Sequence, residues 1–329
     1  MTKARTQLIQ EVTSNLEEAG FDISTQCIVR PSCFDLVARR GEQLVLVKAL
    51  TNIDAFTKED AMALQLVAQF FDAVPLIVGK KTRRGILDEG VVHRRYGVPT
   101  VAPHSFQSMV VQEEKPREFI QRGGRFVSID GAKLKEVRLS RNMTQEELAD
   151  CIQVSARAIL AYEKDEMDVS AEVADRLESE LEIDLADLVI PFDLLSKTVV
   201  HRNLPQSPTA STPSAEDETE GIRRRVNDFF EKLGMSVWWT DRAPFHAVAT
   251  EKGPPLMSGV GSIRSWTLQK RMEIMKSVSK VTESDAVVIV EEGQTEESVS
   301  DLPVIRQLEL DGIDKPRELK KIIEERSEQ

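Results

Sequence analysis

Residues 131–165 constrain the fold more than any other stretch of the chain, because they predict two short helices that cross steeply. The first apolar pattern ends at Asn142, a residue type that accepts the left-handed conformation closing a helix. Thr144 then starts a new helix, since Glu147 lies three residues later and the two can form a capping box. Ser155 is the predicted cap of the next helix. Such a pair presents its second helix outward, as proteins do when they place a helix in the major groove of DNA.

The same stretch closely resembles the Cro and phage-repressor family of helix-turn-helix domains, also called the xenobiotic-response-element family. The residues that carry the resemblance are Leu134, Met143, Thr144, Gln145, Glu146, Glu147, Leu148, Ala149, Val154, Ser155, Ile159, Tyr162 and Glu163. Gln153 departs from the family pattern, which usually has glycine in the turn. A left-handed residue other than glycine costs about 1–2 kcal/mol there. The resemblance implies a five-helix DNA-binding domain, expected over residues 125–195.

The DNA-facing side chains are predicted from the outward helix, expected over residues 156–164, together with the family resemblance. Arg157 is the expected base reader, since arginine pairs with guanine through two hydrogen bonds. Gln145 is expected to touch phosphate, as the resemblance implies. The predicted DNA-binding residues are Gln145, Ser155, Ala156, Arg157, Leu160 and Lys164.

The expected function is that of a sequence-specific transcription regulator acting on double-stranded DNA. The order of domains along the whole chain resembles archaeal helix-turn-helix regulators of about this length. One motif reads only a short half-site, so a homodimer is expected, with the flanking domains supplying the dimer contacts. Basic and acidic side chains balance within residues 131–165. An alternative is therefore a bridging protein whose helical domain binds a basal transcription factor.

The chain has a net charge of −12 at pH 7, which argues against a protein that coats nucleic acids in general. One specific groove contact remains compatible with that charge, since exposed charges act only within about 10 Å at moderate salt. A basic run near the end of the first domain leaves two interpretations open, a contact with DNA phosphate or a solvated face. Its residues are Lys80, Lys81, Arg83, Arg84, Arg94 and Arg95.

An α/β domain is predicted over residues 1–112, because amphipathic helical patterns alternate with strand-like runs. The predicted helices span residues 3–19 and 58–71, and the predicted strands span 23–29, 33–38, 44–49, 74–79 and 98–102, with residues 106–111 closing the unit. This order resembles the restriction-endonuclease-like fold, whose active members use an Asp and an (Asp/Glu)-x-Lys pair.

Asp35 and Lys48 match two of those nuclease residues, but Leu46 stands where the second acid belongs. A divalent metal held against phosphate needs at least two carboxylates. We therefore predict a degenerate nuclease fold that serves as a binding or dimerising scaffold, not an enzyme, with no cofactor and no metal. A DNA nuclease using Asp35 and Lys48 is the alternative.

Two linkers are predicted from composition. Residues 113–130 lead into the helical domain, with Gly123 and Gly124 as a hinge. Residues 204–221 combine Pro, Ser and Thr with a run of acids and cannot build a core, which indicates a flexible acidic linker.

A second α/β domain is predicted over residues 222–329, as a repeat of the first. Residues 230–238 resemble 16–24, and Phe245 aligns with Phe34. His246 then falls at the position of Asp35 and Val260 near that of Lys48, so this copy carries no nuclease residues. The predicted architecture is multidomain, a helical domain flanked by two α/β domains.

Cysteine usage and hydropathy complete the prediction. The three cysteines show no CxxC spacing, which argues against a zinc site or a disulfide framework. Cys151 is predicted to be a small core residue on the inner side of its helix. No apolar run approaches the roughly 20 residues of a membrane helix, and no signal peptide is recognised. We expect a soluble cytoplasmic protein without membrane contact.

Overall fold

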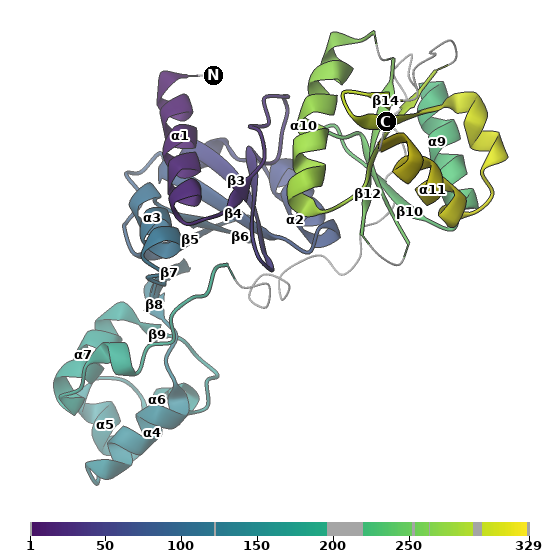
Figure 1. Cartoon of the computed structure of the whole chain (residues 1–329). Coiled ribbons are helices and arrows are strands. Elements are labelled where there is room, and N and C mark those ends of the chain that lie inside the picture. Colours follow the sequence, from purple (N-terminus) through teal and green to yellow (C-terminus); the bar gives the residue numbers. More distant parts are fainter. Residues whose placement is uncertain are drawn as a thin grey trace.

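Two α/β units lie side by side, and a helical domain extends from the first of them (Figure 1). The computed structural model describes residues 2–121, 123–195, 220–251, 254–262, 264–291 and 298–327. The predicted acidic linker, residues 204–221, lies outside the described residues except at its last two positions.

The first unit has the predicted helices and strands in the predicted order, apart from the stretch 23–29, and adds a strand over residues 91–95, which was not predicted. Its elements are α1 (Lys3–Glu18), β1 (Asp22–Ile23), β2 (Leu36–Arg40), β3 (Gln43–Asn52), α2 (Lys58–Phe70), β4 (Val74–Lys81), β5 (Val91–Arg95), β6 (Val98–Val101) and α3 (Pro103–Val111). Gly20 follows α1 with a φ of 75°, and Gly41 turns the β2–β3 hairpin with a φ of 56°, values that glycine adopts without strain. Thr57 and Asp60 form a capping box that starts α2.

The prediction for residues 23–29 is wrong for most of its length. Only Asp22–Ile23 is a strand, and the chain from Ser24 to Asp35 forms a loop. Cys27 and Cys33 are still buried in the core without belonging to a strand, whereas Ile28 between them is exposed. Burial alone therefore gave this loop the appearance of a strand.

The predicted hinge at Gly123 and Gly124 is also wrong. These glycines, with φ of 115° and 138°, turn a hairpin between β7 (Glu118–Gln121) and β8 (Gly124–Val127). β7 pairs in parallel with β5, and β8 pairs with β9 (Val169–Ser170) of the helical domain. Over the described residues the sheet therefore has nine strands and runs without interruption from the first unit into the helical domain.

The second unit has the same strand order and directions as the first six strands of that sheet. Its elements are α9 (Glu220–Lys232), β10 (Ser236–Trp239), β11 (Ala247–Thr250), β12 (Leu256–Gly261), α10 (Trp266–Thr282), β13 (Ala286–Val290), β14 (Ser298–Val299), β15 (Leu302–Arg306) and α11 (Pro316–Ser327). The described strands run β10-β11-β12-β13-β15-β14, against β1-β2-β3-β4-β6-β5 in the first unit.

Strand register aligns the two units residue by residue. Leu36 pairs with Val47 in the first unit as Ala247 pairs with Ser258 in the second. The same register places His246 at the position of Asp35, as the sequence alignment has it. At the position of Lys48 it places Gly259, one residue before Val260, because Lys48 pairs with Ile77 and Gly259 with Val288.

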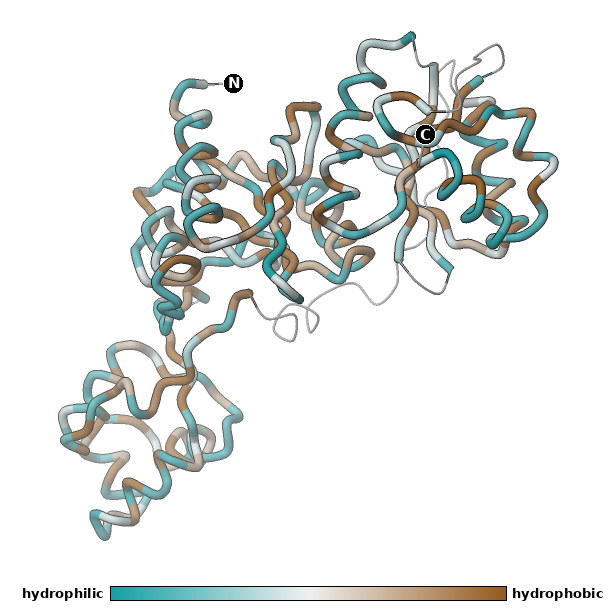
Figure 2. The backbone as a smooth tube through the Cα atoms, viewed as in Figure 1, coloured by the Kyte–Doolittle hydropathy of each residue, from teal (hydrophilic) through white to brown (hydrophobic). Residues whose placement is uncertain are grey.

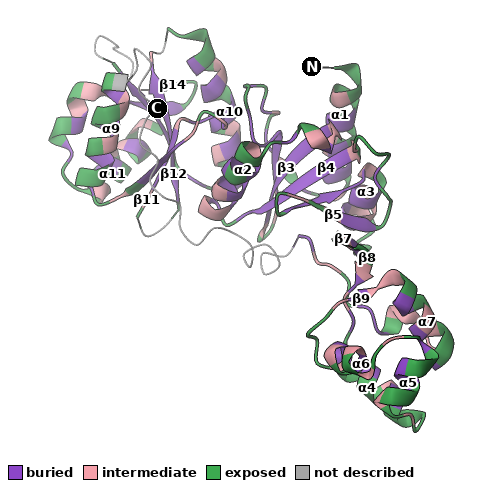
Figure 3. Ribbon diagram, turned by 180° about the vertical axis from the view of Figure 1, so that it is seen from behind, coloured by how far each residue is buried: buried purple, intermediate pink, exposed green. Residues whose placement is uncertain are grey.

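One apolar core is shared by the two units. It joins residues from β2, β3 and α2 to residues from β11, β12 and α10 in a single cluster of buried side chains. Phe71 and Phe245 meet across it with ring centroids 6.0 Å apart, and Phe70 and Trp238 with centroids 5.8 Å apart. Figure 2 shows hydrophobic residues along the strands and hydrophilic ones on the outer helices, and Figure 3 shows the strands buried.

Polar contacts close the rim of this shared core. Arg39 Nε donates to Val281 O at 2.6 Å, and Cys33 N donates to Arg242 O at 2.7 Å. Arg242 also forms an ion pair with Asp60 of α2. Among the described residues, no helix combines the length and the apolar character that crossing a membrane requires.

Substituting Phe245→Ala tests whether the two units are one folding unit. Phe245 is 0% exposed in the shared core, and removing a buried phenylalanine ring costs about 3–5 kcal/mol. We expect hydrogen exchange to accelerate in both β3 and β13, together with a lower denaturation midpoint. Leu177→Ala is the control, since Leu177 lies in the separate core of the helical domain. Faster exchange in β13 with β3 unchanged would contradict a common core.

Candidate nucleic-acid interface

The helical domain consists, in its described residues, of four α-helices and one short 3-10 helix. They are α4 (Gly131–Ser140), α5 (Gln145–Cys151), α6 (Ala156–Glu163), α7 (Ala171–Leu181) and η2 (Leu185–Asp187). The five helical elements that the family resemblance implies are present. Leu134, Leu148, Ile159 and Tyr162 pack into one core beneath them.

Each of the first three helices ends in the same way. The residue after the cap has a left-handed φ, of 57° at Asn142 and 56° at both Gln153 and Asp165. The next backbone N–H then bonds back into the helix, with Met143 N to Arg138 O at 3.2 Å, Val154 N to Ala149 O at 2.9 Å and Glu166 N to Ala161 O at 2.9 Å. These are Schellman motifs. Gln153 therefore adopts the conformation that the family usually gives to glycine.

The predicted helix starts are confirmed. Glu147 N donates to Thr144 Oγ1 at 3.1 Å, and Thr144 N donates to Glu147 Oε2 at 2.8 Å, which makes the capping box of α5. Ala158 N donates to Ser155 Oγ at 3.2 Å and caps α6. The left-handed end of α5 and the Ser155 cap of α6 fix the two ends of the connector. These local contacts therefore set the direction in which α6 runs relative to α5.

Glu163 fixes α6 against the two preceding helices. Arg138 of α4 forms two hydrogen bonds with its carboxylate, at 2.6 and 3.2 Å, and both side chains are nearly buried. Gln145 Nε2 of α5 donates to the same carboxylate at 2.7 Å. At Gly131 a Cβ atom would lie 2.3 Å from Tyr162 O, so α4 starts directly against the backbone of α6. A buried charge pair satisfied on several sides holds the three helices in one geometry.

The outer face of α6 carries most of the predicted DNA-binding residues. Arg157, Leu160 and Lys164 are exposed and follow one another at helical spacing, and Ser155 is exposed at the start of the helix. Ala156 is half-buried beside them. Gln145 differs from the other five, because its amide is bonded to Glu163 inside the domain.

Cys151 is exposed, so the prediction that it lies in the core is wrong. It is the last residue of the short helix α5, and the inner position is taken by Ile152, which is 0% exposed. Leu148 and Ile152 form the buried face of this segment, and Cys151 lies outside that face.

Asp35, the nuclease-like aspartate of the first unit, is surrounded by cations. Its carboxylate is 0% exposed and accepts hydrogen bonds from Arg5 at 2.8 and 3.1 Å and from Arg30 at 3.1 Å. Ala49 N also donates to it at 3.0 Å, and Lys48 Nζ lies 3.9 Å away. Burial lowers the pKa of Lys48, and the charge of Asp35 opposes that shift. In the described residues, no three His, Cys, Asp or Glu side chains gather where they could hold a metal.

His246 repeats part of this arrangement in the second unit. Val260 N donates to His246 Nδ1 at 3.0 Å, as Ala49 N donates to Asp35 in the first unit. Burial, with the nearby charges of Arg271 and Arg223, lowers the pKa of His246 to about 3. In both units the side chain at this position therefore accepts a hydrogen bond from the neighbouring strand, whether it is Asp or His.

The basic run of the first unit is partly neutralised. Lys80 Nζ lies 3.4 Å from Glu11, and Arg95 lies 3.5 Å from Asp54. Lys81, Arg83, Arg84 and Arg94 are exposed. This leaves a smaller basic surface than the sequence indicates.

Family models match both the first α/β unit and the helical domain. The model of a PD-(D/E)XK superfamily domain matches residues 5–116, and a helix-turn-helix model matches residues 134–188. The chain is 35% identical over 327 residues to a "Putative HTH-type transcriptional regulatory protein" of Haloarcula marismortui, covering 99% of this chain and 98% of that protein.

Further relatives carry the same description. Identity is 34% over 320 residues to a protein of Thermococcus kodakarensis, covering 97% of this chain and 96% of that protein. It is 35% over 328 residues to one of Halobacterium salinarum, covering 99% and 98%. The chain belongs to this family of archaeal HTH-type regulatory proteins. No solved structure matches it.

Both family resemblances seen in the sequence are thereby confirmed for this HTH-type regulatory protein. The sequence did not indicate Arg5 and Arg30, which occupy the carboxylate of Asp35. They come from α1 and from the loop before β2, and no spacing rule links a helix and a loop to one strand residue. The absence of an acid two residues before Lys48 is visible in the sequence as Leu46, but the cations around Asp35 could not be inferred from it.

Because of His246, we expect the folded state to lose stability as the pH is lowered. Its pKa is depressed from an ordinary 6.5 to about 3 in the folded state. As the pH falls below 6.5, the unfolded chain takes up a proton that the folded chain does not, so stability present above pH 6.5 is lost progressively toward pH 3. The slope is at most about 1.4 kcal/mol per pH unit.

Replacing His246→Asn should reduce this loss, because an amide oxygen can accept the Val260 N–H without titrating. Urea unfolding at pH 7 and pH 5 measures the difference. His104→Asn, at an exposed histidine, is the control. His93, whose pKa is also lowered by burial, titrates in both variants. Equal pH dependence in wild type and His246→Asn would rule out the assignment.

Proposed function

We propose that this protein is a transcription regulator that reads a specific DNA sequence with α6. The observation that carries the proposal is the fixed presentation of α6, whose inner face is locked through Glu163 and whose outer face carries Arg157, Leu160 and Lys164. A rigid helix can report base identity, because hydrogen bonds to base edges require fixed geometry.

Each exposed residue of α6 has a suitable partner on DNA. Arg157 offers two parallel donors to guanine O6 and N7, and Leu160 offers an apolar contact to a thymine methyl group. Ser155 and Ala156 lie at the start of the helix, which is the end that enters the groove. Lys164 supplies a phosphate contact at the other end. Gln145 reaches phosphate only after its amide leaves Glu163.

A homodimer is part of the proposal. The sequence carries one motif, and one recognition helix covers only a half-site. Two copies would read half-sites about 34–36 Å apart. The apolar faces of α2 and α10 are already used within the chain, so the dimer contact must come from other surfaces.

Arg157→Glu tests the reading of DNA. In a selection from random duplexes, we expect the wild type to enrich a pseudo-palindrome. The substitution should lower affinity for it at least tenfold, because losing a bidentate base contact costs about 1–3 kcal/mol and a new negative charge is added. A salt series counts the phosphate contacts from the slope of affinity.

Lys321→Glu is the matched control, since it makes the same change of charge on α11, where Lys321 is exposed. Enrichment of no sequence, with Arg157→Glu binding like the wild type, would refute the proposal. The favoured hypothesis would then be that the helical domain binds a basal transcription factor through the exposed Leu139, Leu160 and Met167.

A metal-dependent DNA nuclease is the second candidate, favoured by the PD-(D/E)XK match over residues 5–116. The pairing of Asp35 with Arg5 and Arg30 opposes it, because those guanidinium groups occupy the oxygens a metal would need. We expect no nicking of supercoiled plasmid in Mg²⁺ or Mn²⁺. Nicking that disappears in Asp35→Asn, with the circular dichroism spectrum unchanged, would establish the nuclease instead.

A further inference from the structure

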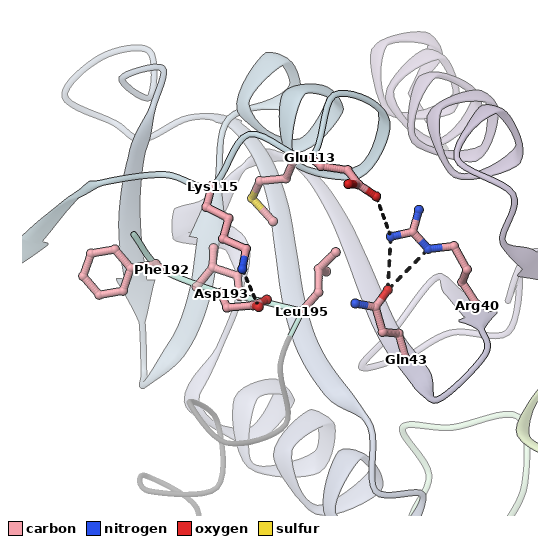
Figure 4. Close-up of a pocket in the computed structure, with 9 residues that line it drawn as sticks. Arg40, Gln43, Glu113, Lys115, Phe192, Asp193 and Leu195 are labelled. Atoms are coloured by element: carbon pink, nitrogen blue, oxygen red, sulfur yellow. Dashed lines mark hydrogen bonds and ion pairs between the residues drawn. The ribbon is translucent and has the colours of Figure 1, made fainter. Parts of the chain in front are cut away.

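A pocket of about 260 Å³ lies where the helical domain joins the first α/β unit. Three segments line it (Figure 4): the β2–β3 hairpin, the end of α3 with the chain that follows, and the chain that returns from the helical domain. The lining residues are Arg40, Gln43, Met109, Glu113, Lys115, Phe192, Asp193, Leu194 and Leu195.

Two of these segments are the chain entering and the chain leaving the helical domain. They are held together directly, since Lys115 Nζ lies 2.8 Å from Asp193 and Phe192 N donates to Pro116 O at 2.8 Å. Leu194 and Leu195 are buried in the core of the first unit. Anything bound in the pocket therefore touches both connections of the helical domain and the unit to which they attach.

The pocket has an apolar floor and a rim of both charges. Met109, Leu194 and Leu195 supply the floor, which is small because all three side chains are buried. Figure 4 shows Lys115 and Asp193 paired on one side, and Arg40 near Glu113 and Gln43 on the other. Its volume lies just below the roughly 300–1,000 Å³ of pockets that take drug-sized ligands, so the ligand must be small.

Contacts within the protein fix the position of the Arg40 guanidinium at the rim. One of its Nη atoms donates to Ala19 O at 3.0 Å, the other donates to Gln43 Oε1 at 3.2 Å, and the guanidinium lies 4.6 Å over the Phe21 ring. Little side-chain freedom is lost when such a group binds a carboxylate.

The acidic groups of the rim are readily released from their present partners. Glu113 is 78% exposed and lies 4.0 Å from Arg40, and Asp193 is 40% exposed in its pair with Lys115. Exposed ion pairs contribute little, so a ligand can replace them at low cost.

We propose that this pocket binds a free α-amino acid with an apolar side chain, and that its occupancy changes the affinity of the helical domain for DNA. The ligand carboxylate pairs with Arg40 or Lys115, its ammonium group with Glu113 or Asp193, and its side chain lies on the apolar floor. By holding both connections against the first unit, the ligand favours one orientation of the helical domain. The second half of the proposal rests on the proposed DNA-binding function.

Calorimetric titration of the full chain tests the site without DNA. The probes are L-valine, L-leucine and L-methionine, with 4-methylpentanoate and 3-methylbutylamine as leucine analogues that lack the ammonium and the carboxylate group. We expect at least one amino acid to bind at submillimolar concentration and both analogues to bind at least about tenfold more weakly. Absence of binding by all three amino acids at millimolar concentration would overturn the site. Equal binding of either analogue would overturn its assignment to a zwitterion.

Lys115→Gln and Glu113→Gln should each weaken binding about fivefold or more, because each removes a charge from the rim. Lys232→Gln is the matched control, since Lys232 is 52% exposed and pairs with Asp314 far from this pocket along the chain. Unchanged affinity in both rim variants would place the ligand elsewhere and overturn the proposal.

DNA affinity measured with and without the bound amino acid then tests the coupling. A shift of at least about threefold, lost in Lys115→Gln, is expected. Amino-acid binding by a protein that reads no DNA sequence would refute the proposed function and the coupling but keep the site. DNA reading by a protein that binds no amino acid would overturn the site alone.

Discussion

The apolar core between α2 and α10 is the contact on which the arrangement of the two α/β units depends. Phe71 and Phe245 meet there, as do Phe70 and Trp238. Because the two units have the same strand order, their packing resembles a dimer contained in one chain.

The change of chemistry at Asp35 is a consequence of charge, not of shape. The strand register and the backbone contact at this position are those of its counterpart His246, so the fold has no need of an acid there. Two arginines and a lysine around a single carboxylate leave positive charge in excess, the reverse of what a divalent cation requires. One position thus retains its place in the sheet while its side chain changes from Asp to His.

Local features were predicted from the sequence because their causes lie within a few residues. The caps at Thr144 and Ser155 and the left-handed Asn142 depend on contacts spanning three to five positions, and all three are found. The β7–β8 hairpin was missed because its glycines look the same in a hinge and in a turn. The pairing of Arg5 with Asp35 joins residues 30 positions apart and carries no periodic signal. The pocket beside Arg40 combines three distant segments and could not be foreseen.

The paired strands from β5 through β7 and β8 to β9 join the helical domain to the first unit through a continuous sheet and not through a flexible linker. Backbone hydrogen bonds thus connect the domain that carries α6 to the larger body. In a dimer of such chains, the protein would set the distance between the two DNA half-sites. An operator whose half-site spacing differs by one base pair would have to twist in order to bind.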